Sequence, residues 1–517
     1  MAIPSVDPQK LAAVRKRYAE EASKRLKPEG SSQFVPLTSA DEERLRSLAD
    51  APWVDHEALN ARPSPIKDGD AAGGFGGTWY WNCFPGLHCD VESYVYLPLL
   101  EETGYVPRQK YASDAEVREH AERIAEKWDL VDRTLFRADV EGVEWDDSAQ
   151  LWTITAMEHR GPTDVLTRQQ IPRIPGLPSF KGESFHTARW NYAVSGGSQA
   201  DQRLTGLEGK RVAVVGTAAT AIAVVPEVAK YAGELYVIQR TPAPVRPRGQ
   251  RVTDPKEFQA KVATGKGWQF KRSLNLNTFI TNSVAPGLHN LVNDAWTDMP
   301  AYSVIVGTPN HGVTDSSPEV LERHADAYHS LDLPHMESVR ARVDELVDDP
   351  IRPPSSNHAT LHGYATSGFP NLFFSGTSQA TITGNNVFML GFIAQHITYM
   401  IGDAERRVGR GPGRGQGHRQ EQRAIIEVTR DGEEAHTAEI LRRAPFYSVL
   451  AGCTPGYFNG HGDSANVTDP EEKARRARGV TWSEGTISFL EYIGRWRDEG
   501  SLKGLDVVPA GDVRARP

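Results

Sequence analysis

Cysteine is scarce in this chain: three residues, Cys83, Cys89 and Cys453, occur among 517. Three thiols cannot build the disulfide framework of a small secreted protein. They indicate a reducing compartment, and we expect a cytoplasmic protein. No stretch of about 18 apolar residues occurs, and the first residues lack the apolar core of a signal peptide. The sequence therefore argues against a secreted or membrane-spanning chain.

Basic residues are not in excess either. The 58 Lys and Arg residues stand against 67 Asp and Glu, which gives a formal net charge of −9. This balance argues against nucleic acid or an anionic membrane as a partner. Residues 406–423 are a local exception, rich in Arg and Gly with no aromatic residue between them. An RNA-binding tract is one interpretation of this segment, but its composition favours a disordered surface loop.

Several elements of the first half can be predicted from local patterns. Residues 1–64 read as an extension with one amphipathic helix over residues 8–27. Ser113 and Glu116 form a capping box, which predicts a helix of about 14 residues. Aromatic and β-branched residues on both sides of a polar turn predict a β-hairpin over residues 136–157.

The second half begins with a strand–turn–helix–strand pattern, which is the order of a βαβ unit. Residues 212–215 are the first apolar strand, and residues 234–239 are the second. Residues 255–348 lack this strand rhythm and are predicted to be a helical insertion. Toward the C-terminus, residues 371–375 are expected to form a short buried strand and residues 386–401 an apolar helix.

The turn of the βαβ unit has the pattern Gly216-x-Ala218-x-x-Ala221, close to the G-x-G-x-x-G of dinucleotide sites. Glycine allows a tight turn after the strand, and the helix N-terminus then faces the pyrophosphate. Alanine is acceptable at the third position, but the methyl group of Ala218 lies where the phosphates approach. Arg240 and Thr241 follow the second strand, where an arginine accepts a 2′-phosphate, so NADP is favoured over NAD. The alternative is a βαβ unit with an ordinary surface arginine.

A second motif, F-x-G-x-x-x-H-x-x-x-W, covers residues 180–190 directly ahead of this unit and contains His186 and Trp190. It resembles the fingerprint of Baeyer–Villiger monooxygenases, flavin enzymes that insert oxygen beside a ketone carbonyl. The N-terminal extension is similar to that of the longer members of this family. Further segments that resemble the family are residues 76–94, 368–379 and 453–460.

The resemblance implies an α/β fold with two Rossmann-like dinucleotide-binding domains, the FAD domain being incomplete, and a helical insertion. The implied order is an extension (1–64), the FAD-binding domain with a linker (65–200), the NADP-binding domain with the insertion (201–350), and the rest of the FAD-binding domain (351–517). It also implies FAD and NADPH as cofactors, with O2 and a bulky or cyclic ketone as substrates. The product would be an ester or a lactone.

Site residues follow from the same resemblance. Asp90 would orient a catalytic arginine, and His186 with Trp190 would belong to a moving linker that couples the two domains. These three are the catalytic candidates. The residues implied to contact the flavin are Gly76, Gly77, Thr78, Trp79 and Asp90. Those implied to hold NADP are Gly216, Thr217, Ala218, Ala221, Arg240 and Thr241.

Three parts of the family pattern are absent from the sequence. No strand–glycine–helix unit precedes residues 73–79 to hold the FAD pyrophosphate. No apolar strand precedes residues 174–176, and only Arg352 is basic where the family supplies a catalytic basic pair. A descendant that binds nucleotide without flavin chemistry is therefore a second hypothesis. The sequence does not indicate an oligomeric state.

Two other classes of site are disfavoured. A hydrolase would need a G-x-S-x-G turn, and the chain has none. Cys83 and Cys89 flank His88, but no second ligand pair follows, so no metal site is predicted. We expect both cysteines to be packing residues.

Overall fold

The computed structural model describes residues 7–26, 29–36, 48, 53–54, 57–58, 68–70, 73–158, 170–239, 245, 248–308, 319–320, 322–333, 360–376, 379–409, 423–443 and 477–510. The N-terminal extension contains α1 (Pro8–Arg25), the 3-10 turn η1 (Gly30–Gln33) and β1 (Phe34–Pro36). The carboxylate of Asp7 accepts a hydrogen bond from the Gln9 N–H, and Pro8 opens the helix, a position that proline favours. The helix predicted over residues 8–27 is confirmed.

Four helices follow the Gly-rich segment: α4 (Thr78–Trp81), α5 (Ser93–Tyr96), α6 (Leu100–Thr103) and α7 (Asp114–Lys127). The predicted α7 is confirmed, and its Ser113 hydroxyl accepts from the Glu116 N–H at 3.3 Å. The capping box is only half formed. Oε1 of Glu116 accepts instead from the Tyr105 hydroxyl at 2.9 Å and from the Arg108 N–H at 2.6 Å. Glu116 thereby ties α7 to the chain before it.

The strands of the first half form three separate pairs. β2 (Asp68–Asp70) pairs in parallel with β3 (Thr134–Phe136), which follows the short turn η3 (Val131–Arg133). β4 (Ala138–Asp146) and β5 (Leu151–Glu158) form the predicted hairpin, and β1 pairs with β6 (Gln170–Pro172). Phe136 belongs to β3 and not to the hairpin, because Arg137 has a positive φ of 58° that interrupts the strand.

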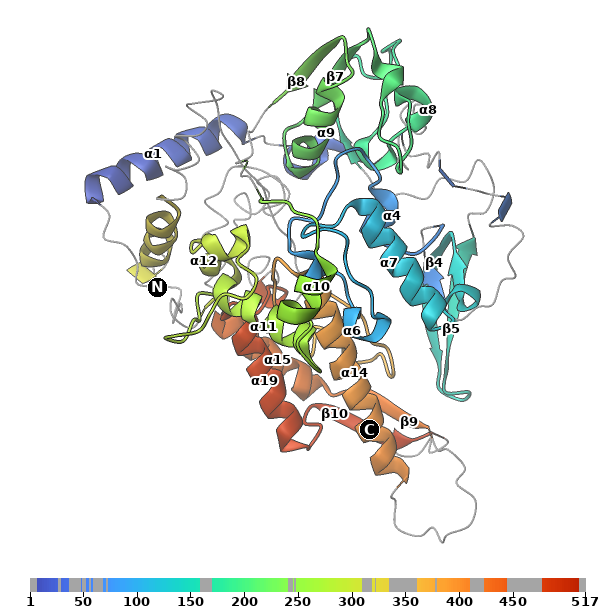
Figure 1. Ribbon diagram of the computed structural model, residues 1–517. Helices are drawn as coiled ribbons and strands as arrows, with labels where there is room; N and C mark the ends of the chain where they lie inside the picture. Colours follow the sequence, from blue (N-terminus) through green and yellow to red (C-terminus); the bar gives the residue numbers. More distant parts are fainter. Residues whose placement is uncertain are drawn as a thin grey trace.

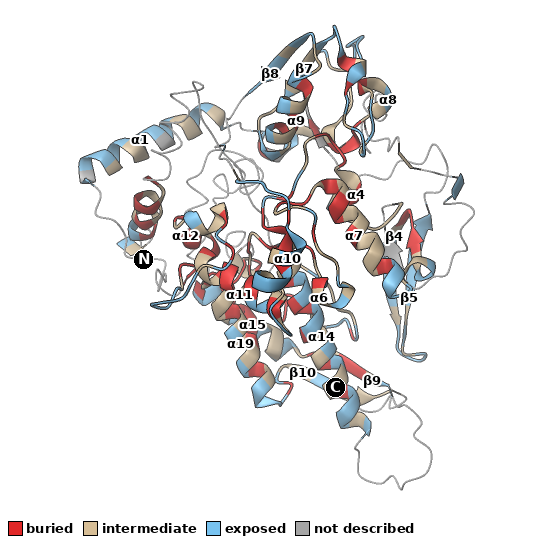
Figure 2. Cartoon of the chain, in the orientation of Figure 1, coloured by how far each residue is buried: buried red, intermediate tan, exposed pale blue. Residues whose placement is uncertain are grey.

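The βαβ unit consists of β7 (Arg211–Val215), α9 (Ala219–Ala229) and β8 (Glu234–Ile238), with parallel strands as predicted. It follows η4 (Thr187–Arg189), α8 (Tyr192–Ser195) and η5 (Thr205–Leu207). One face of the strand pair packs on α9, whereas Val215, Tyr236 and Ile238 are 57%, 52% and 53% exposed. Figure 2 shows the same contrast between the strands and the helix. Among the described residues, those of α9 cover one face of the β7–β8 pair, and the other face is exposed.

The insertion is helical in its described part, which agrees with the prediction for residues 255–348. Its elements are α10 (Pro255–Glu257), the π-helical turn η6 (Phe258–Val262), α11 (Trp268–Ile280), η7 (Ala295–Asp298) and α12 (Tyr302–Val306). A buried cluster joins α11 to the aromatic segment through Leu276, Val91 and Val95.

The C-terminal part contains α14 (Asn386–Gly409), β9 (Ala424–Val428), α15 (Arg430–Arg443), α19 (Gly485–Glu499) and β10 (Leu505–Pro509). Figure 1 places these helices and the antiparallel β9–β10 pair at the opposite end of the molecule from the βαβ unit. The helix predicted over residues 386–401 is confirmed and continues to Gly409. Two predictions here need correction.

The strand predicted over residues 371–375 is wrong. Asn371 has a positive φ of 55°, and its N–H donates to the Ile426 carbonyl. The Phe374 N–H donates to a different segment, at Tyr364. The loop predicted from residue 406 is also wrong at its start, since Arg406 and Arg407 lie in α14 and pair with Asp403 at 2.9 and 2.8 Å. Residues 410–422 lie outside the described residues.

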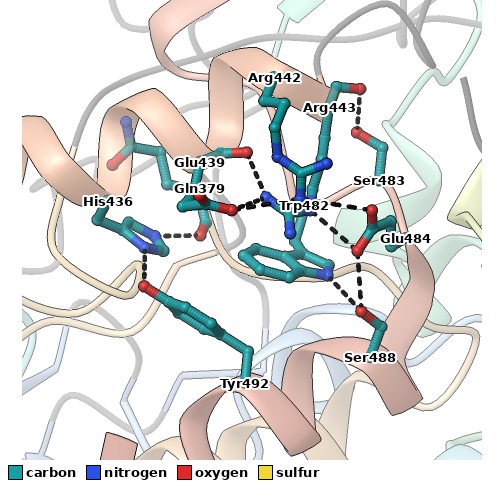
Figure 3. A network of polar contacts seen from close by, with 10 residues as sticks. All are labelled: Gln379, His436, Glu439, Arg442, Arg443, Trp482, Ser483, Glu484, Ser488 and Tyr492. Carbon is teal, nitrogen blue, oxygen red and sulfur yellow. Dashed lines mark hydrogen bonds and ion pairs between the residues drawn. The ribbon is translucent and has the colours of Figure 1, made fainter. Parts of the chain in front are cut away.

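A buried polar network closes the C-terminal core, as Figure 3 shows. The guanidinium of Arg443 lies 3.7 Å over the Trp482 ring, and its Nε is 3.1 Å from Glu484. Nε2 of His436 lies 3.0 Å from the Gln379 carbonyl. Across the described ranges the strands form two-stranded sheets, and no helix there has the length and apolar character to cross a membrane.

Candidate functional site

The turn that enters α9 is open. Gly216 has a positive φ of 102°, and a Cβ built on it would meet no atom within 4 Å. Its N–H donates to the Ile238 carbonyl at 2.8 Å, which fixes the end of β7 against β8. Ala218 is the exposed N-cap residue and has no side-chain oxygen to cap α9. Its carbonyl accepts from the Ala221 N–H at 2.9 Å, so of the first three N–H groups of α9 those of Ala219 and Thr220 are left to other acceptors.

The structure describes some, but not all, of the other residues predicted to hold NADP. Thr217 is half-buried in the turn. Ala221, at the third position of the pattern, is buried. Arg240 and Thr241 lie outside the described residues, so their prediction stays untested.

The aromatic segment has its own open position at Gly77. This exposed residue has a φ of +54°, caps α4, and would place a Cβ with nothing within 4 Å. Thr78 beside it is exposed, whereas Trp79 is half-buried. The Trp79 indole N–H donates to the Tyr96 hydroxyl at 3.1 Å, and the two rings meet edge to face.

Two glycines that precede Gly77 in the chain each have a side chain packed where a Cβ would lie. A Cβ on Gly74 would lie 3.1 Å from the Tyr80 ring. A Cβ on Gly76 would lie 3.1 Å from Cγ of Arg118, which belongs to α7. Side chains therefore occupy the Cβ direction of both glycines.

His186 and Trp190 fold into the linker. Nδ1 of His186 accepts from the Ala188 N–H at 3.2 Å, which caps η4. Burial lowers the pKa of His186, with a smaller contribution from Arg189, so the imidazole is neutral at pH 7. The Trp190 indole is buried and donates to the Ser195 hydroxyl at 3.0 Å.

Linker, aromatic segment and α9 share one core. Trp190 packs with Phe84 and with residues of α9 in a single buried cluster. The Arg189 guanidinium lies 4.0 Å over the Trp81 ring. Gly86 comes so close to α9 that a Cβ there would lie 2.6 Å from the Ala223 carbonyl oxygen. The structure thus brings together three segments that the sequence singled out.

Asp90 has an arginine partner that the sequence did not reveal. Its exposed carboxylate lies 3.3 Å from Nη2 of Arg248, and Nη1 of Arg248 lies 3.7 Å from the buried Asp294. The Trp296 indole N–H donates to the Asp90 carbonyl at 3.1 Å, and Arg248 lies over the same ring. Arg248 is therefore held between two carboxylates.

A second arginine, Arg272 of α11, fixes the aromatic segment from inside. Its Nε and Nη2 donate to the two carboxylate oxygens of Glu92 at 2.6 and 2.9 Å, and both side chains are buried. Asn385 adds a bond from the C-terminal part, since its amide donates to the Val95 carbonyl at 2.9 Å. These contacts hold the segment rigid from two sides.

Cys83 and Cys89 are buried free thiols, as predicted for packing residues. Burial raises the pKa of each to about 12, so neither is a thiolate at neutral pH. In the part of the chain that the structure describes, no group of His, Cys, Asp and Glu is arranged to hold a metal ion. Cys453 lies outside that part.

Comparison with known proteins decides the family. No family model matches the chain. A polycyclic ketone monooxygenase of Thermothelomyces thermophilus is 39% identical over 98% of this chain and 98% of its own length. Its namesake structure from Thermothelomyces thermophila superposes with a TM-score of 0.87 at 38% identity, over 97% of this chain and 99% of that one. The chain belongs to the Baeyer–Villiger monooxygenase family.

Further relatives agree with this family. An FAD-binding monooxygenase of Penicillium brasilianum is 36% identical over 85% of this chain and 82% of its own. A steroid monooxygenase structure bound to NADP matches with a TM-score of 0.57 at 18% identity, over 85% of this chain and 94% of that one, which shows a shared fold. The predicted family, α/β fold class and enzyme class are confirmed.

The internal deletions are confirmed as well. The alignment with the Thermothelomyces relative extends over 653 positions, whereas this chain has 517 residues. The relative therefore carries stretches that have no counterpart here.

Proposed function

We propose that this family member is an FAD- and NADPH-dependent enzyme that inserts one oxygen of O2 beside the carbonyl of a bulky polycyclic or cyclic ketone. The product is an ester or a lactone. The substrate class rests on the relative named a polycyclic ketone monooxygenase, and the flavin on relatives named FAD-binding monooxygenases. One observation carries the proposal: the aromatic segment, the linker and α9 pack into one core around Trp190.

NADPH fits the turn before α9. Gly216, Thr217 and Ala218 would hold its pyrophosphate at an open helix N-terminus, with Arg240 and Thr241 on the 2′-phosphate. Ala221 would keep α9 close to the strands. The buried cluster around α9 supports a fixed position for this helix and its turn.

FAD fits the described residues in part. The open, exposed Gly77 and Thr78 beside Trp79 suit the ring end of a flavin, whereas the closed Gly74 and Gly76 do not suit a pyrophosphate. Bound flavin supplies the passage of electrons from NADPH to O2. The protein's own contribution is to orient the partners, exclude water and stabilise negative charge.

Asp90, His186 and Trp190 keep the roles that the resemblance implies. Asp90 holds a cation in place, and the described candidate for that cation is Arg248. A guanidinium fixed by carboxylates stabilises an anion that forms near it. His186 and Trp190 would position the linker against α9 and would not take part in the chemical step themselves. A cytoplasmic location is part of this proposal and is supported by the buried reduced thiols.

An isotope-labelling experiment tests the proposed oxygen transfer from O2 to the ketone. Protein supplied with FAD, NADPH and a polycyclic ketone under 18O2 should consume NADPH and give an ester or lactone that carries one labelled oxygen, read by mass spectrometry. The corresponding alcohol should give no oxygenated product. NADPH oxidation without label in the product would contradict the proposed function, and so would a failure to oxidise NADPH.

A further inference from the structure

A buried carboxylate, that of Asp294, lies where the aromatic segment meets the insertion. Asp294 is 1% exposed. Its Oδ2 accepts a hydrogen bond from the Glu92 N–H at 3.1 Å, and its Oδ1 accepts from the Trp296 N–H at 3.1 Å, which caps η7. Both donors are main-chain groups, so the backbone fixes this side chain from two sides.

The loop that carries Asp294 is itself anchored to its neighbours. The Asn275 amide of α11 donates to the His289 carbonyl at 2.8 Å, and its Oδ1 accepts from the Leu291 N–H at 2.8 Å. On the other side the Trp296 ring packs against the C-terminal part, since a Cβ on Gly384 would lie 3.3 Å from it. The carboxylate therefore has little freedom to move.

The guanidinium of Arg248 faces this carboxylate. Its Nη1 lies 3.7 Å from Oδ1 of Asp294, which is too long for a hydrogen bond, and is buried without another hydrogen-bond partner among the described residues. Burial raises the pKa of Asp294, whereas the Trp296 N–H and the charge of Arg248 lower it. The contact between Asp294 and Arg248 is thus an attraction between two charges.

The two carboxylates beside Arg248 differ in how strongly they hold it. The Asp90 side chain is 56% exposed, and water weakens its attraction to Nη2 at 3.3 Å. The Asp294 side chain is fully buried, where a pair of charges interacts more strongly. The Trp296 ring, 5.8 Å from the guanidinium, adds a cation–π contact.

We propose, on the basis of the function proposed above, that Asp294 is a positioning residue for oxygen transfer and acts through Arg248. The buried carboxylate holds the guanidinium beside Asp90, where it stabilises the negative charge that forms during the reaction. Asp294 needs no contact with the ketone for this role. A guanidinium displaced by about 1 Å would stabilise that charge far less, since such misplacements cost roughly a hundredfold in rate.

A double-mutant cycle tests this inference with full-length protein, FAD, NADPH and a polycyclic ketone under 18O2. Asp294→Asn removes the charge and keeps an oxygen that can cap η7. The share of consumed NADPH that appears as labelled ester or lactone should fall roughly tenfold or more. Arg248→Gln should cause a loss of at least this size. The double variant should lose no more than Arg248→Gln alone, because Asp294 has no effect without its partner.

Two further variants serve as controls. Asp298→Asn removes a negative charge from an exposed position of the same turn and should leave the labelled yield unchanged. Asp294→Ser keeps a hydroxyl cap for η7 and places no amide against the Glu92 N–H, so it replaces Asp294→Asn in the cycle if that variant does not fold. Urea denaturation shows which variants fold.

The outcomes separate the two proposals. Losses that multiply in the double variant would mean that Asp294 acts independently of Arg248, which would overturn this inference and leave the proposed function standing. An undiminished labelled yield in Asp294→Asn would do the same. Wild-type protein that gives no labelled product would overturn both. A loss in Asp294→Asn that disappears in the Arg248→Gln background would support both.

Discussion

At Ala218 a single methyl group sits at the N-cap of α9, exposed beside the open turn. Because the pyrophosphate must approach the backbone at this position, Ala218→Gly should bind NADPH more tightly, by roughly threefold to tenfold. Glycine is also a better N-cap than alanine, so the change does not weaken the helix. The dissociation constant, measured from NADPH fluorescence, checks this prediction.

The control is the same substitution at the other end of α9. Ala229→Gly should lower the free energy of unfolding by up to about 1 kcal/mol, since glycine disfavours helix, and should leave NADPH affinity unchanged. An unchanged affinity in Ala218→Gly would show that the methyl group does not crowd the ligand.

Residue patterns predicted some site residues and could not predict others. Gly216 and Trp190 belong to motifs in which the spacing carries the information. Arg248 and Arg272 were missed because their carboxylate partners lie 158 and 180 residues away in the chain. An arginine in a polar segment gives no signal of such a partner, because the pairing exists only after folding.

At the scale of elements, local determinants were enough for α1, α7, the β4–β5 hairpin and the βαβ unit. Caps, turn residues and hydrophobic periodicity lie within each of these segments. The segment at residues 371–375 was different. An apolar run forms a strand only if neighbouring strands accept its hydrogen bonds, and here the two N–H groups of Asn371 and Phe374 donate to unrelated segments.

The packing of the aromatic segment on α9 depends on a glycine. Gly86 has a φ of +77°, and a Cβ there would lie 2.6 Å from the Ala223 carbonyl oxygen. Gly86→Ala should therefore lower the free energy of unfolding by about 2–4 kcal/mol, through backbone strain and overpacking together. Urea denaturation measures this loss.

Gly104→Ala separates the two causes. Gly104 has a similar φ of +69°, but a Cβ there would meet nothing within 4 Å. We expect this control to lose only about 1 kcal/mol, from the backbone conformation alone. Equal losses in the two variants would mean that the close approach to α9 is of no consequence.

At the scale of the whole molecule, the deletions explain why predicted sheets and observed sheets differ. In a doubly wound fold both faces of a parallel sheet are covered. Here the described strands form pairs, and Val215 and Ile238 remain more than half exposed on one face of β7–β8. The sequence could predict each βαβ element, but not how many strands the shortened chain still assembles around it.

Stability of the whole molecule also depends on three buried histidines of the C-terminal core. Nε2 of His396 contacts Nδ1 of His362 at 3.2 Å, and Nδ1 of His396 accepts from Nε of Arg497 at 3.1 Å. The His436 ring packs against that of His362, with Tyr492 3.4 Å from its Nδ1. Arg497 opposes protonation of His362 and His396, and Arg443 opposes protonation of His436, where the carboxylate of Glu439 has a smaller effect in the other direction.

Burial lowers the pKa of His396 to about 3 and that of His436 to about 4, and it lowers the pKa of His362 well below its ordinary value of 6.5. Below pH 6.5 the unfolded chain therefore binds more protons than the folded one, and stability falls as the pH falls. The slope should approach about 1.4 kcal/mol per pH unit for each histidine. Urea denaturation between pH 7 and pH 5 measures it, and comparison with a His436 variant separates the histidine share from that of buried carboxylates such as Glu92 and Asp294, whose pKa is raised by burial. His436→Gln should reduce the slope by one histidine's share, and a stability that stays constant over this range would refute the prediction.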